Sequence, residues 1–191
     1  NSSFRIGAEE GSVDTVPFGF FKRSIFDKVG LFDERLLRAQ DYELNRRIIN
    51  YGGKIWLNPA IKAKYFNQPS LIKFFKKTLT LEAPYNAYMW YFAPYTFSIR
   101  HSITMFFTLG FMGGLLLSFF SVILYSIFSA IMLLYFLLAI FSSFKLALRD
   151  SEWRHVFSLP IVFLFFHLIH GLGVLYGLFR IMLKKHPTYN L

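Results

Sequence analysis

The carboxylate best placed to do chemistry is Asp41, which follows Gln40 and opens a helical pattern with Leu44, Ile48 and Tyr51 on one face. A carboxylate in such a place can accept a proton from a hydroxyl nucleophile as a general base. Aspartate is also a favoured N-cap residue, and the position alone favours that structural role. The two roles are compatible, so the pattern leaves both open.

Two histidines, His167 and His170, are the other candidates for chemistry, and their spacing places them on one face of a helix. A metal site would need further ligands, and the apolar segment around them contains no Asp, Glu or Cys. We therefore expect these histidines to pack or hydrogen-bond inside a helical bundle. The chain has no cysteine, which excludes thiolate zinc sites, iron–sulfur clusters and cysteine nucleophiles.

The elements around Asp41 predict part of an α/β layered domain over residues 1–66. Ser12–Phe21 is β-branched and aromatic and predicts a strand ending in a turn. The helix from Asp41 ends at Gly52-Gly53, and Lys54–Leu57 predicts a second strand. Strands that alternate with helices in this way are typical of an α/β fold. Neither a glycine-rich phosphate loop nor an Asp-x-Asp pair is present, so we expect the nucleotide-binding half to lie outside this chain.

The second half of the chain has the composition of a membrane protein. Of 191 residues, 20% are aromatic and 17% charged, and no charged residue lies between Ser102 and Phe144. A spanning helix needs about 20 apolar residues. We expect three spans, at about residues 103–120, 122–144 and 156–181. A tight turn near Phe119–Ser126 joins the first two; one long kinked helix is the alternative.

Basic residues near the span ends predict the orientation. Arg100 precedes the first span, and Lys145, Arg149 and Arg154 lie between the second and third. Because cytoplasmic loops are enriched in Lys and Arg, the polar half is expected in the cytoplasm, at the inner or plasma membrane. A basic tail, residues 184–191, conflicts with this rule unless the third segment is re-entrant or interfacial.

Residues 67–101 predict an approach to the membrane. Tyr85–Tyr95 is rich in aromatic rings, which favour the headgroup layer. Ser70–Leu81 combines lysines with Leu, Ile and Phe, which suits a helix lying on anionic lipid. An ordinary amphipathic helix packed on its own domain explains the same pattern equally well.

Four segments in order carry a resemblance to a known family. They are Val13-Asp14-Thr15-Val16-Pro17-Phe18-Gly19, Phe26–Glu34 (FDKVGLFDE), Gln40–Arg47 (QDYELNRR) and Gly52–Pro59 (GGKIWLNP). Together they resemble the acceptor-side half of family 2 glycosyltransferases, above all the membrane-bound enzymes of exopolysaccharide assembly of the succinoglycan-biosynthesis type.

The resemblance implies a GT-A fold, a nucleotide-sugar donor, a glycan or polyprenyl-linked acceptor, and single-displacement transfer with inversion. It implies that Asp41 is the general base, and that Phe18, Gly19, Gln40 and Arg47 bind substrate. For Phe18-Gly19 a plain turn, and for Arg47 a solvated helix face, are the structural alternatives. A full-length member would use Mg²⁺ or Mn²⁺ at an Asp-x-Asp motif, so this chain alone is expected to bind no metal.

Other functions fit the sequence less well. The chain begins without methionine or signal peptide, so we expect it to be a segment of a longer protein. The alternative to an enzyme is an inactive, membrane-anchored binding or assembly module. The net charge of +10 permits nucleic-acid binding, but acidic residues lie among the basic ones, so no nucleic-acid partner is expected. The expected spans lack the internal carboxylates or lysines that mark ion paths.

Overall fold

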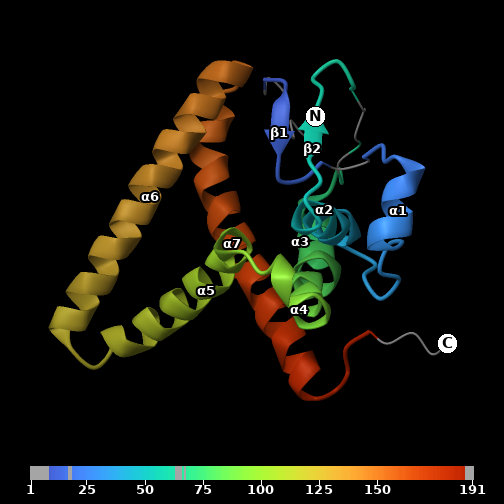
Figure 1. Cartoon of the computed structure of the whole chain (residues 1–191). Coiled ribbons are helices and arrows are strands. Elements are labelled where there is room, and N and C mark those ends of the chain that lie inside the picture. Colours follow the sequence, from blue (N-terminus) through green and yellow to red (C-terminus); the bar gives the residue numbers. More distant parts are fainter. Residues whose placement is uncertain (1–8, 17–18, 63–65, 67, 188–191) are drawn as a thin grey trace. The chain divides into compact units, whose positions relative to one another are not determined.

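The computed structural model of the chain describes residues 9–16, 19–62, 66 and 68–187 (Figure 1). Helices make up most of the ordered structure. The elements in chain order are β1 (Gly11–Val13), α1 (Arg23–Val29), α2 (Gln40–Asn50), β2 (Ile55–Leu57), α3 (Leu71–Lys77), the π-helical segment η1 (Thr78–Glu82), α4 (Ala83–Phe92), the 3-10 turn η2 (Pro94–Thr96), α5 (Ile99–Ser118), α6 (Val122–Asp150) and α7 (Arg154–Met182).

The predicted α/β domain of GT-A type is wrong. Within the described residues the strands are β1 and β2, three residues each, paired antiparallel with Ser12 opposite Trp56. A ribbon of two short strands has no face large enough to support a layer of helices. Of the apolar side chains of the expected strand, Val13 lies in β1, whereas Val16 and Phe21 lie outside it; they pack against the cluster that α2 and β2 form.

The chain divides into two compact units, Asn1–Ser98 with Gly173–Leu191, and Ile99–Leu172. Among the described residues of the first unit, apolar side chains form two clusters. One is centred on Leu44 and Ile48 of α2 with Ile55 of β2. The other joins Leu36, from the loop before α2, to three side chains of α4, with Ile181 at the end of α7 packed against it; the α4 members are Tyr85, Tyr88 and Met89.

The segment from α3 to α4 is continuously helical over 71–92, which extends the helix predicted at Ser70–Leu81. The side-chain oxygen of Ser70 caps it by accepting a hydrogen bond from the Lys73 backbone N–H at 3.4 Å. The helix widens to a π turn before Pro84, which has no N–H to continue the α ladder. Of the tyrosines predicted to form an interfacial belt, Tyr85 and Tyr88 are buried in the first unit, whereas Tyr91 is exposed.

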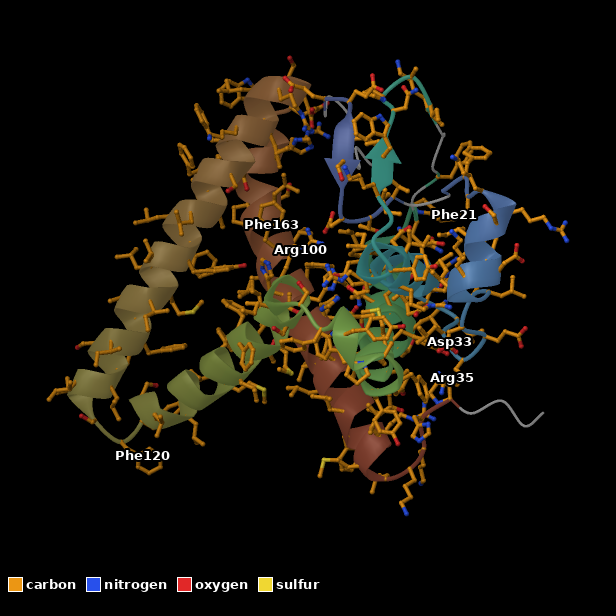
Figure 2. All side chains as sticks on the ribbon, in the orientation of Figure 1. Phe21, Asp33, Arg35, Arg100, Phe120 and Phe163 are labelled. Atoms are coloured by element: carbon orange, nitrogen blue, oxygen red, sulfur yellow. The ribbon has the colours of Figure 1, made fainter. Side chains whose placement is uncertain are left out.

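Three helices, α5, α6 and α7, are long and apolar enough to cross a membrane. Two residues, Phe119 and Phe120, make the turn between α5 and α6, and Figure 2 shows Phe120 at this turn. Ser121 then caps α6 by accepting a hydrogen bond from the Ile123 N–H at 3.2 Å. The prediction of a helical hairpin here is confirmed, and the alternative of one long kinked helix is wrong.

Glycines of α7 make close contacts inside each unit. A Cβ on Gly171 would collide with Thr104 and Thr108 of α5, in the second unit. In the first unit, a Cβ on Gly177 would lie 2.7 Å from the Pro84 carbonyl oxygen and 3.0 Å from the Ala87 Cβ. Small residues allow helices to approach this closely. The end of α7 therefore packs on α4 as part of the first unit.

Candidate functional site

Asp41 is the second residue of α2 and is half-buried. The N-cap is Ala39, which takes a left-handed conformation with φ of 65° and has no side chain that can cap the helix. Asp41 is therefore not the N-cap. Burial raises the pKa of Asp41 above its ordinary value. A raised pKa makes the carboxylate a stronger proton acceptor when it is ionised.

Asn45, one helical turn after Asp41, fixes a chain segment along the same face of α2. Its side chain is fully buried, and its amide nitrogen donates hydrogen bonds to Thr15 Oγ1 at 2.8 Å and to the Val16 carbonyl oxygen at 3.1 Å. Asn45 thereby holds residues that immediately precede the predicted acceptor loop. No sequence pattern predicts this role of Asn45, because its partners Thr15 and Val16 lie about 30 residues earlier in the chain.

The predicted acceptor loop is described only in part. Phe18 lies outside the described residues. Gly19 is half-buried, and a Cβ there would lie 2.7 Å from the ring of Phe21 and 3.3 Å from a methyl group of Val16. Gln40, the other predicted contact, is the first residue of α2 and is half-buried beside Asp41.

The Arg47 side chain forms hydrogen bonds with other groups of the protein. It does not extend into solvent and does not point toward Asp41. Six residues separate it from Asp41, which is about 240° of rotation on a helix, so the two face different sides of α2. Its guanidinium donates to both carboxylate oxygens of Glu43, at 2.6 and 2.7 Å. It also donates to the carbonyl oxygens of Val29 at 2.6 Å and Leu31 at 2.8 Å.

Glu43 is the residue whose importance the sequence pattern underestimates. Its side chain is buried, with 2% exposure, although a first-turn glutamate is ordinarily solvated. Besides Arg47, it accepts a hydrogen bond from the hydroxyl of Tyr95 in η2. Burial, followed by this hydrogen bond, raises the pKa of Tyr95 well above its ordinary range. The Glu43–Arg47 spacing of four residues was the available signal.

Glu43, Arg47 and Tyr95 form what we call the α2 network. It ties α2 to the end of α1 through Val29, to the following loop through Leu31, and to η2. Because Asn45 holds the other face, α2 is fixed on two sides. The beginning of α2, with Gln40 and Asp41, is therefore held by contacts of the buried side chains of Glu43 and Asn45.

Asp33 and Arg35 form a second ion pair, on the loop before α2 (Figure 2). The carboxylate accepts from Arg35 Nε at 2.9 Å and from its terminal nitrogen at 2.7 Å. The hydrogen bonds from Arg35 lower the pKa of Asp33 below its ordinary value. The Arg35 side chain is 46% exposed and lies over the ring of Phe92. Asp33 is thus a half-buried carboxylate paired with an exposed arginine, and its pKa is lowered whereas that of Asp41 is raised.

The histidines of α7 hydrogen-bond inside the second unit, as expected. The Tyr135 hydroxyl lies 2.9 Å from His167 Nδ1, and Thr104 Oγ1 lies 2.8 Å from His170 Nδ1. These contacts join α7 to α6 and to α5. Across the described part of the chain, no three His, Asp or Glu side chains gather as a metal site would require. Among the described residues there is thus no ligand set that fits the metal implied by the resemblance for a full-length enzyme.

Comparison with known proteins gives one informative similarity. The chain is 27% identical over 193 aligned residues, covering 99% of its length, to a dolichyl N-acetyl-alpha-D-glucosaminyl phosphate 3-beta-D-2,3-diacetamido-2,3-dideoxy-beta-D-glucuronosyltransferase of Methanococcus voltae. That relative is a glycosyltransferase. The chain spans about half of it, 53% of its length. No protein family and no solved structure matches the chain.

The similarity agrees with the predicted resemblance at a coarse level. It is a similarity to a glycosyltransferase, and three apolar helices fit a membrane-bound one. Membership of family 2 and the succinoglycan type stay predictions, as do the roles of the individual site residues.

Proposed function

We propose that the chain is the membrane-anchored part of a glycosyltransferase that moves a sugar from a nucleotide-sugar onto a lipid-phosphate-linked glycan. The observation that carries this proposal is the similarity over 99% of the chain to a transferase whose name specifies a dolichyl-phosphate-linked sugar. The three apolar helices support it, because a polyprenyl-linked acceptor is held in a bilayer.

Asp41 is the general base in this proposal. The acceptor hydroxyl attacks the anomeric carbon of the donor sugar while Asp41 takes the hydroxyl proton. A new glycosidic C–O bond forms, the bond from the anomeric carbon to the nucleotide diphosphate breaks, and the diphosphate leaves with the electron pair. Attack opposite the leaving group inverts the anomeric centre. Half-burial and the raised pKa of Asp41 support this assignment.

The α2 network positions this base without touching substrate. Arg47 and Glu43 hold α2 to the loop that leads into it, and Asn45 holds the segment before the predicted acceptor loop. The donor-binding half, with any divalent metal, belongs in our proposal to the remainder of a longer protein, since the chain spans only half of its relative. In this proposal the polar half of the chain, residues 1–66, faces the cytoplasm, in line with Arg100 at the start of α5 and with Arg149 and Arg154 at the adjoining ends of α6 and α7.

A transfer assay with the full-length protein in nanodiscs tests the proposal. The protein receives a panel of nucleotide-sugars together with a polyprenyl-phosphate-linked N-acetylhexosamine, and the mass of the lipid product is measured by mass spectrometry. We expect a mass gain of one sugar residue and release of nucleotide. Absence of any gain across the panel, with correctly folded protein, contradicts the proposal.

A binding titration, read together with the transfer assay, separates the enzyme from a membrane-anchored binding or assembly module. The 191-residue chain alone is titrated with nucleotide-sugars and Mn²⁺. We expect no saturable binding, because the donor site is proposed to lie elsewhere. Saturable binding by this chain would overturn that placement, and inactivity of the full-length protein would favour the module.

A further inference from the structure

The helix α3 presents an exposed face on which apolar and cationic side chains lie next to each other. Ile72 is 81% exposed and Leu71 is 57% exposed, and Lys73 and Lys76 are also exposed. Isolated exposed apolar residues are common, but two adjacent ones on one short helix require an explanation.

The arrangement around the helix axis is ordered. At about 100° per residue, Leu71, Phe75 and Ile72 share an arc of roughly 100°, and Lys76 followed by Lys73 occupies the next arc. Beyond the Leu71 edge of this arc lie Thr78, which is buried, and Phe74, which is half-buried, so that side of the segment faces the rest of the first unit. The exposed surface therefore has an apolar strip bordered by cations.

The charge of this face is purely positive. No acidic residue lies between Gln68 and Leu81. The acidic residue that follows, Glu82, is engaged by Lys77 at 2.9 Å and Arg38 at 3.5 Å. Among the described residues, Lys73 and Lys76 have no ion-pair partner. The cations at the edge of the apolar strip thus have no counter-charge there.

We propose that α3 lies on an anionic lipid surface, with Leu71 and Ile72 at the acyl boundary and Lys73 and Lys76 at lipid phosphates. A protein partner is the less suitable occupant, because lysine is depleted in buried interface cores. At a bilayer, by contrast, the ammonium groups stay hydrated among headgroups while the apolar side chains leave water. The bilayer is also near along the chain, since α5 begins at Ile99.

A spin label tests this placement. The chain has no cysteine, so Ile72→Cys gives a single labelling site once any cysteine outside these 191 residues is replaced by serine. Tyr51→Cys, at the end of α2, is the matched control because Tyr51 is 56% exposed. The full-length protein is placed in nanodiscs with and without phosphatidylglycerol, and label accessibility to oxygen and to a water-soluble nickel chelate is measured.

We expect the label at Ile72 to be oxygen-accessible and nickel-protected in anionic nanodiscs, and the label at Tyr51 to be nickel-accessible. Neutral lipid, or Lys73→Gln with Lys76→Gln, should raise nickel accessibility at Ile72 severalfold. Equal nickel accessibility at both sites overturns the proposal. Protection of the Ile72 label from both oxygen and nickel would show that protein covers the site, and this result also overturns the proposal. If nickel accessibility at Ile72 changes neither with lipid charge nor with the two lysine substitutions, the requirement for anionic lipid is overturned.

Discussion

Replacing Arg47 by lysine isolates the geometry of the α2 network from its charge. Lysine keeps a cation beside Glu43 but cannot form the planar fork that contacts both carboxylate oxygens. It also cannot reach the carbonyl oxygens of Val29 and Leu31 at the same time. The variant therefore keeps the buried carboxylate neutralised while loosening the loop that leads into α2.

The expected cost follows from the contacts. Arg47 makes two hydrogen bonds to a carboxylate that is 2% exposed and two to backbone carbonyls, with its own side chain 22% exposed. Hydrogen bonds involving charged groups contribute about 1.5–3 kcal/mol each, and lysine restores part of this. We expect a net loss of about 2–3 kcal/mol in local stability. Removing the cation altogether, as in Arg47→Ala, should cost about 3–5 kcal/mol.

Hydrogen-exchange mass spectrometry in nanodiscs measures this loss where it occurs. A loss of about 2–3 kcal/mol speeds exchange roughly 30- to 160-fold when exchange follows local opening. The amides of α2 and of residues 29–31 should show this change. Arg35→Lys is the matched control, because the Arg35 side chain is 46% exposed and surface pairs contribute about 1 kcal/mol or less. Equal acceleration by Arg47→Lys and Arg35→Lys would refute the reasoning from burial.

Three further predictions follow from single contacts. Burial raises the pKa of Asp41, so the ionised side chain lowers the free energy of unfolding. Asp41→Asn should therefore be more stable than wild type, and the difference should grow as the pH rises from 3.8 through the raised pKa. Denaturant titrations at several pH values measure this difference. Gly177→Ala should destabilise the contact with Pro84 and Ala87, seen as faster exchange in α4, whereas Gly110→Ala, where a Cβ meets nothing within 4 Å, should not. Tyr135→Phe should lower the free energy of unfolding in detergent micelles by about 1 kcal/mol, because it removes the hydrogen bond that joins α6 to His167 of α7. Tyr125→Phe is the control. An equal free energy of unfolding for the two variants would contradict a role for this hydrogen bond.

The helices around Asp41 and in the apolar half were predictable from sequence because their signals are local. Helical periodicity located α2, and hydropathy located α5, α6 and α7. The turn at Phe119–Phe120 was predictable from length, since one continuous helix would exceed the bilayer.

The prediction of an α/β fold was wrong because strand propensity does not show where apolar side chains are buried. Val16 and Phe21 fit a strand, but they pack on α2. The partners of Glu43 were equally hidden, since Tyr95 lies 52 residues further along the chain. The contact of Gly177 with α4 was hidden in the same way, because the Gly173-x-x-x-Gly177 spacing is typical of contacts between spanning helices and does not point to α4.

The most direct measurement is the rate of sugar transfer by full-length Asp41→Asn, compared with Asp33→Asn as the matched carboxylate. If Asp41 removes the acceptor proton, the Asp41 variant should lose about 10²- to 10⁴-fold in rate at saturating donor and acceptor. Asp33→Asn should retain transfer, because Asp33 is paired with the exposed Arg35 outside the site. Near-wild-type transfer by Asp41→Asn would contradict the assignment.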